Sequence, residues 1–180
     1  MIILITGASH TGKTLLAQRL LERTGFPYLS IDHLKMGLIR SGQTKLTPAD
    51  DDVLTDYLWP IVREIVKTAI ENRQNLIVEG CYVPVDWRKD FADSYLSEIR
   101  FVCLVMTDAY IDAHFEEITA HASAIEARLD DTYCSAVWLK AQNRAYMEGF
   151  QACGENITRI DSDYGQTIEK LLKDKEKELC

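Results

Sequence analysis

Residues 1–14 read MIILITGASHTGKT. The first six are apolar or β-branched throughout, which is the pattern of a strand buried on both faces. Residues 7–14 match the pattern G-x-x-x-x-G-K-[ST], and from Lys13 to Thr24 apolar side chains recur at helical spacing before Gly25 ends the pattern. A strand, a glycine-containing turn and a helix thus follow one another at the start of the chain, and this order decides the fold class.

The turn between that strand and that helix has the composition of a phosphate-binding loop. Its backbone N–H groups must wrap around an anion, which requires small residues at the bends, and the N-terminus of the following helix attracts negative charge. Lys13 is expected to reach the β- and γ-phosphates of a nucleotide, and the Thr14 hydroxyl to ligate Mg²⁺. His10, an unusual occupant of such a loop, is either an exposed side chain or a phosphate contact. The residues expected to contact the nucleotide are Gly7, Ala8, Ser9, His10, Thr11, Gly12, Lys13, Thr14 and Leu15.

Beyond Gly25, strand patterns alternate with helix patterns to the end of the sequence. Such alternation predicts parallel strands joined by right-handed crossovers. We therefore expect a single α/β domain over 1–180, a three-layer fold with a five-stranded parallel sheet between helices. Further strands are expected at 28–31, 76–79, 99–106 and 156–160, and further helices at 33–40, from Thr47 past Ala69, at 108–119, at 132–152 and from about 164 onward.

The long helix pattern in the first half of the chain has a marked beginning. Thr47 supplies a hydroxyl cap, Pro48 stands at the first helical position and Asp50 at the third. Pro60 is expected to kink this helix. Its buried face is expected to carry Leu54, Leu58, Ile61, Ile65 and Ala69.

Composition limits the classes of function. The chain has 180 residues and a formal net charge of −8, with 28 acidic against 20 basic residues. An acidic balance argues against a dedicated nucleic-acid binder, and no apolar run reaches the length of a membrane span. Five cysteines, an odd number without a C-x-x-C pair, fit a reducing compartment, so a cytoplasmic protein is expected. Monomer and homodimer both remain open.

The motifs that accompany the phosphate loop distinguish among its users. The D-x-x-G and N-K-x-D elements of switch GTPases do not occur, and the strand at 76–79 does not end in the Asp-Glu pair of larger ATPase motors. Instead, four stretches together resemble the small phosphate-loop kinases: Gly7–Thr14, Tyr28–Gly42 (YLSIDHLKMGLIRSG), the strand end I-V-E-G at 77–80, and Arg128-Leu129-Asp130-Asp131. That superfamily includes the adenylate-type, shikimate, gluconate and chloramphenicol kinases, and the chain looks like an adenylate-kinase-like member of the 2-phosphoglycerate-kinase kind.

The resemblance implies an ATP- and Mg²⁺-dependent phosphotransferase with four catalytic residues, among them Lys13. Asp32 matches the acid that contacts the acceptor and in several of these kinases takes its hydroxyl proton, although its position also suits the N-cap of the helix at 33–40. Glu79 matches the group that holds Mg²⁺ or orients the acceptor, and otherwise it is a surface-facing strand end. Arg128 matches a lid arginine that closes over ATP, with the lid at about 120–132.

The acceptor is expected to bind the segment 33–72. Lys35 stands where adenylate-type enzymes have an arginine, and Glu79-Gly80-Cys81-Tyr82-Val83-Pro84 replaces their Asp-Gly-Phe-Pro-Arg, so transfer to a nucleoside monophosphate is disfavoured. The remaining basic residues of the segment suggest a small, anionic metabolite. The residues expected to bind it are Asp32, Lys35, Arg40, Arg88 and Arg144. Two alternatives stay open: a nucleoside or nucleotide kinase, and an ATP- or ADP-binding regulatory module without transfer.

Overall fold

A computed structural model describes residues 1–121 and 134–178 of the chain. Its centre is a five-stranded sheet in the order β2-β3-β1-β4-β5, and all four neighbouring pairs are parallel. The expected parallel α/β sheet is confirmed. The strands are β1 (Ile2–Gly7), β2 (Tyr28–Ser30), β3 (Leu76–Glu79), β4 (Ile99–Met106) and β5 (Thr158–Ile160).

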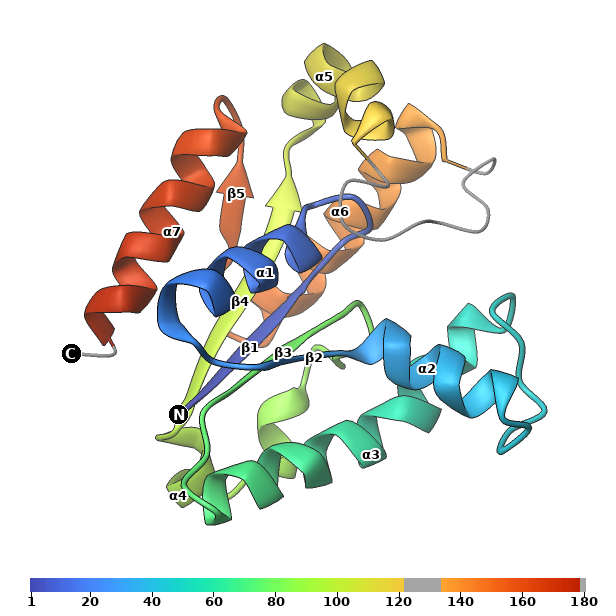
Figure 1. Ribbon diagram of the computed structural model, residues 1–180. Coiled ribbons are helices and arrows are strands. Elements are labelled where there is room, and N and C mark those ends of the chain that lie inside the picture. Colours follow the sequence, from blue (N-terminus) through green and yellow to red (C-terminus); the bar gives the residue numbers. More distant parts are fainter. Residues whose placement is uncertain (122–133, 179–180) are drawn as a thin grey trace.

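Helices cover both faces of the sheet, as a three-layer fold requires (Figure 1). One face packs against α1 and α7, and the other against α3 and α6. The helical elements are α1 (Lys13–Thr24), α2 (Ile31–Arg40), α3 (Asp51–Glu71), the 3₁₀ turn η1 (Trp87–Asp90), α4 (Asp93–Leu96), α5 (Asp108–Ala120), α6 (Ala136–Ala152) and α7 (Tyr164–Glu178).

The first strand explains why residues 2–5 are apolar without interruption. Ile3 and Ile5 pack with Leu16 of α1, whereas Ile2 and Leu4 pack on the opposite side, where α3 contributes its own apolar face. All four strand side chains are fully buried. Each such side chain stabilises the fold by about 1.5–3 kcal/mol relative to exposure, so the central strand is a main contributor to stability.

The predicted start of α3 is wrong by three residues. The backbone N–H and the hydroxyl of Thr47 both donate to Asp50 Oδ2, at 2.7 and 2.8 Å, but they close a turn that precedes the helix. The helix itself begins at Asp51, with Asp50 at the N-cap position. Thr47 therefore pairs with the Asp50 carboxylate, and the helix starts after this pair instead of within it.

The predicted buried face of α3 is also partly wrong. Val62 and Val66 are fully buried, whereas Ile61 and Ile65 are only partly covered. The pair Ile61 and Ile65 and the pair Val62 and Val66 both continue the helical spacing from Leu58. All four side chains are apolar, so the pattern alone does not show which pair is buried. The helix runs through Pro60 within its assigned bounds.

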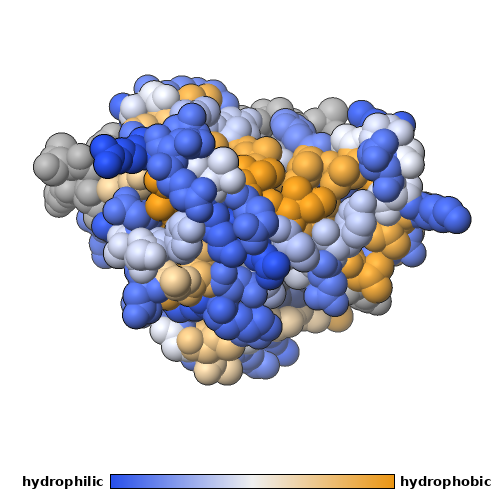
Figure 2. All heavy atoms as spheres, turned by 90° about the horizontal axis from the view of Figure 1, so that it is seen from below, coloured by the Kyte–Doolittle hydropathy of each residue, from blue (hydrophilic) through white to orange (hydrophobic). Residues whose placement is uncertain are grey.

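The side on which α3 and α4 lie, at the bottom of Figure 1, carries both hydrophilic and apolar areas (Figure 2). Within 1–121 and 134–178, no helix is both long and apolar enough to cross a lipid bilayer.

A buried thiol and a partly buried phenol make the stability fall at high pH. Burial raises the pKa of the Cys103 thiol and of the Tyr164 phenol to about 12, from ordinary values of 9.0 and 10.0. Between the ordinary and the raised pKa values, the unfolded chain binds fewer protons than the folded chain, so the free energy of unfolding decreases as pH rises through that window. We expect the urea midpoint to be lower at about pH 10.5 than at about pH 8. In Cys103→Ala the decrease should be smaller, and an unchanged wild-type midpoint would contradict this account.

Candidate active site

The phosphate loop leaves the sheet at Gly7, where β1 and β4 approach closely. Gly7 has φ 145°, and a Cβ there would lie 2.2 Å from the carbonyl oxygen of Leu104. The next carbonyl, that of Ala8, accepts bonds from the Thr11 hydroxyl and from Lys13 Nζ, both at 2.8 Å. The lysine ammonium thus folds back over the loop that it is expected to serve, and its side chain is almost fully buried.

The first residue of α7 packs against the phosphate loop. Gly12 has φ 80°, and a Cβ there would lie 1.8 Å from the hydroxyl oxygen of Tyr164, the first residue of α7. His10 also has a positive φ, 66°, a conformation that non-glycine residues adopt rarely outside turns and functional sites. Tyr164 was not expected from the sequence, since nothing in its local pattern links it to residues 7–14, far earlier in the chain.

Thr14 and Glu79 meet at the carboxyl edge of the sheet. The Thr14 hydroxyl donates to Glu79 Oε2 at 3.3 Å, and only 1% of Glu79 is exposed. Ser30 lies opposite Glu79 in the β2–β3 register, and its buried hydroxyl has no hydrogen-bond partner among the described residues. Carboxylate and hydroxyl oxygens are the donors that Mg²⁺ prefers, so this pair fits the ion.

Asp32 belongs to the first turn of α2, because the helix begins at Ile31 and Ser30 occupies the N-cap position. The alternative of Asp32 as N-cap is therefore wrong. Lys35 Nζ donates to Asp32 Oδ1 at 2.5 Å and to the Tyr82 hydroxyl at 2.9 Å. The Tyr82 hydroxyl in turn donates to Asp51 Oδ1 at 2.7 Å. Tyr82 and Asp51 were not expected from the sequence, although Tyr82 follows Glu79 by only three residues.

The four arginines named from the sequence have different surroundings. Arg40 is exposed at the end of α2 and has no ionic or hydrogen-bond partner within the described chain. Arg88 bonds to the buried Glu155, and breaking a pair with a buried carboxylate is costly, so a structural role is the simpler one. Arg144 pairs with Asp108 at the start of α5, on the surface. Arg128 and most of the expected lid lie outside the described residues.

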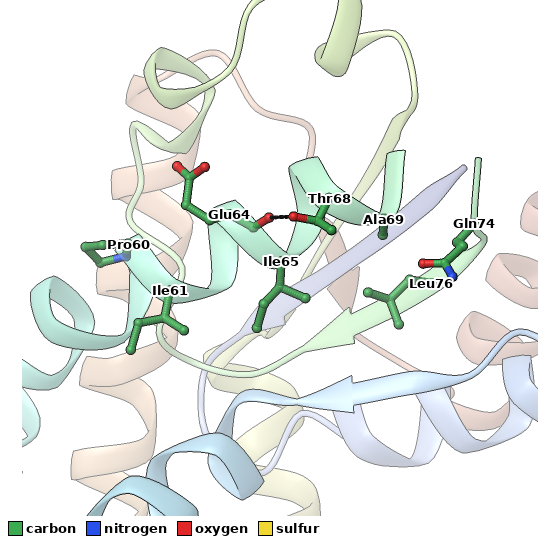
Figure 3. Close-up of a pocket in the computed structure, with 8 residues that line it drawn as sticks. All are labelled: Pro60, Ile61, Glu64, Ile65, Thr68, Ala69, Gln74 and Leu76. Atoms are coloured by element: carbon green, nitrogen blue, oxygen red, sulfur yellow. Dashed lines mark hydrogen bonds between the residues drawn. The ribbon is translucent and has the colours of Figure 1, made fainter. Parts of the chain in front are cut away.

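A cavity of about 440 Å³ lies elsewhere, between α3 and the amino end of β3 (Figure 3). Ile61 and Ile65 point into it, which explains why these side chains are only partly covered. The phosphate loop and Glu79 stand at the opposite, carboxyl edge of the sheet, so this cavity is not part of the candidate site. In 1–121 and 134–178, no group of three or more His, Cys, Asp or Glu side chains is arranged to hold a metal ion.

Comparisons with known proteins give the family of the chain and relatives of its fold. A family model described as AAA domain matches residues 2–152. The chain belongs to the AAA domain family. No curated protein matches this AAA domain chain in sequence.

Several solved structures are similar in fold to this AAA domain protein. A gluconokinase from Sinorhizobium meliloti 1021 has a TM-score of 0.52 and 18% identity, and the match covers 98% of this chain and 95% of that one. A shikimate kinase from Aquifex aeolicus has a TM-score of 0.57 and 13% identity, with 99% and 98% covered. A sugar kinase from Janibacter sp. HTCC2649 has a TM-score of 0.52 and 18% identity, with 96% and 92% covered. The resemblance to small phosphate-loop kinases is thereby confirmed for the fold.

Proposed function

We propose that the chain is an ATP-dependent phosphotransferase that moves the γ-phosphoryl group to a hydroxyl of a small metabolite. The observation that carries the proposal is the contact between Thr14 and Glu79, because it joins the helix after the phosphate loop to the end of a neighbouring strand. Ligands of parallel α/β sheets bind at this carboxyl edge. A site that only bound nucleotide would need no carboxylate besides Glu79, the proposed metal ligand. Asp32 is a second carboxylate, and it follows the carboxyl end of β2, the strand beside β3.

Each group has one proposed task. The ammonium of Lys13 exchanges its bond to the Ala8 carbonyl for bonds to the β- and γ-phosphates. The loop amides and the N-terminus of α1 bind the negatively charged phosphates. Thr14 and Glu79 hold Mg²⁺, which when bound neutralises charge on the phosphate oxygens. Asp32 orients the acceptor hydroxyl and accepts its proton. Arg128 is proposed to close over the transferred group from the lid.

The segment 33–72 is proposed to bind the acceptor. The proposal that the acceptor is anionic rests on Arg40 and Lys45, whose side chains are exposed in the described structure. Lys35 supports this point less than the sequence suggests, because Asp32 and Tyr82 already engage its ammonium.

Changing Asp32 separates transfer from nucleotide binding. In Asp32→Asn we expect kcat to fall by about 100- to 10,000-fold, the usual contribution of a general base, while the KM for ATP changes by less than about twofold. The assay uses an acceptor found by a thermal-shift screen of metabolites with a non-hydrolysable ATP analogue, since ligands that bind only the folded state raise the Tm. Asp93→Asn, at an exposed position on α4, is the matched control.

Other outcomes of that screen favour other functions. Stabilisation by nucleoside monophosphates alone, followed by their phosphorylation, would make the protein a nucleotide kinase. Tight ATP binding without transfer to any acceptor, and with no effect of Asp32→Asn, would leave an ATP-binding regulatory module.

A further inference from the structure

The side chain of Lys35 is held by a residue of its own helix and by one residue of another segment. Its ammonium donates to Asp32 on α2 and to Tyr82 on the loop after β3, and it lies 4.9 Å from the centre of the Tyr82 ring. Only 12% of the side chain is exposed. A lysine has a flexible stem and loses rotamer freedom when it is fixed, so a single partner seldom orders it, whereas two bonds and a ring do.

The directions of these hydrogen bonds are fixed by chemistry. An ammonium only donates, so the Tyr82 hydroxyl accepts from Lys35 and must use its own proton toward Asp51. Burial and the Asp51 carboxylate raise the pKa of Tyr82, which keeps the phenol protonated at every pH at which a kinase works. The chain from Asp51 to Tyr82 to Lys35 to Asp32 is therefore continuous, and Lys35 donates toward both of its ends.

The segment that carries Tyr82 is itself anchored on several sides. The Thr6 hydroxyl of β1 donates to the Gly80 carbonyl at 2.9 Å, and the Tyr146 hydroxyl of α6 donates to the Cys81 carbonyl at 2.6 Å. A Cβ at Gly80 would lie 2.7 Å from that of Ile31, so this segment and the start of α2 touch directly. Tyr82 consequently presents its hydroxyl from a rigid support.

We infer that Tyr82 is a positioning residue of the acceptor side: with Asp51 it holds Lys35 as the fixed counter-charge of Asp32. Lys35 occupies Oδ1 of Asp32, and Oδ2 has no other bond within the described residues. Oδ2 is then the oxygen that faces the acceptor hydroxyl. Lys35 thus positions the Asp32 carboxylate and does not bind the acceptor. Through its bond from Tyr82, Asp51 links Lys35 to the first turn of α3, which belongs to the segment proposed to bind the acceptor. The inference rests on the proposed function of Asp32.

The test removes the phenol oxygen and keeps the ring. In Tyr82→Phe we expect kcat for the acceptor to fall by about tenfold while the KM for ATP changes by less than about twofold, because the nucleotide side is untouched. Asp51→Asn should show the same split, and the double variant should be no worse than about the larger single effect, since both act through one link. Tyr95→Phe is the matched control, because Tyr95 donates to Glu71 at the same 2.7 Å far from the site.

A second measurement does not need activity. Acetylation of Lys35 by an amine-reactive reagent, followed by peptide mass spectrometry, reports how firmly the ammonium is held, with the exposed Lys45 as internal reference. Lys35 should react roughly fivefold faster in Tyr82→Phe than in the wild type, and at an unchanged rate in Tyr95→Phe.

The outcomes separate this inference from the proposed function. An unchanged kcat in Tyr82→Phe would overturn the inference, whatever the labelling shows, and unchanged labelling of Lys35 would do the same. If the wild-type protein transfers phosphate to no acceptor, the proposed function fails, and the labelling of Lys35 alone then decides whether Tyr82 holds it.

Discussion

Replacing Lys13 with methionine should lower kcat/KM for ATP-dependent transfer by about 100- to 1,000-fold, the usual loss when one preorganised charge-stabilising group is removed. Lys13 is the cation of the phosphate loop, and its ammonium now bonds to the Ala8 carbonyl, 2.8 Å away. In phosphoryl transfer the protein acts mainly by positioning and by neutralising developing charge, so few other groups can replace it. Methionine keeps the length of the apolar stem and removes only the charge.

The control for this variant is a partly buried lysine elsewhere that has a hydrogen-bond partner of its own. Lys67 on α3 bonds to Glu64 at 3.0 Å and lies 5.7 Å from the ring centre of Phe91. Lys67→Met should leave kcat/KM within about twofold of the wild-type value. Retention of more than about a tenth of the activity in Lys13→Met would show that Lys13 does not act on the phosphates.

Replacing Gly7 with alanine should lower the free energy of unfolding by about 3 kcal/mol or more, since both backbone strain and overpacking apply at this position. Its φ of 145° is unfavourable for any side chain, and the added methyl group would meet the backbone of Leu104 on β4, at 2.2 Å from the carbonyl oxygen. Backbone in a central strand pair cannot move aside without breaking the ladder, so the methyl group has nowhere to go.

Gly25→Ala is the matched control for this change. Gly25 ends α1 with φ 73°, and nothing lies within 4 Å of the position that a Cβ would take. This variant bears the strain of a left-handed backbone alone and should lose about 1 kcal/mol. Urea denaturation of both variants compares the two losses directly. Equal losses would mean that β1 and β4 do not approach each other at Gly7 as described.

The elements that sequence predicts well are those in which local pattern and burial agree. β3 and β4 have the predicted bounds because their apolar runs are buried in the middle of the sheet. The phosphate loop is predictable because it needs small residues at fixed spacing. The buried face of α3 could not be predicted, since Ile61 and Val62 are equally apolar. Which of the two is buried depends on how the helix is turned relative to the sheet.

The acceptor side of the site shows the limit of sequence reasoning. Asp32 and Glu79 could be placed because each ends or follows a strand of a parallel sheet. The bonds from Lys35 to Tyr82 and from Tyr82 to Asp51 join residues 47 and 31 positions apart. Those contacts depend on how α2 and α3 dock against the segment after β3, and no periodicity or local motif encodes that docking.

The most direct test of the central claim follows the γ-phosphate itself. The protein is incubated with Mg²⁺, ATP labelled in its γ-phosphate and a fractionated pool of polar metabolites, and the products are separated chromatographically. The account predicts a labelled small molecule distinct from ATP and orthophosphate, absent with Lys13→Met and retained with Lys67→Met. Label that stays in ATP or appears only as orthophosphate in every fraction, from a protein that binds ATP, would contradict it.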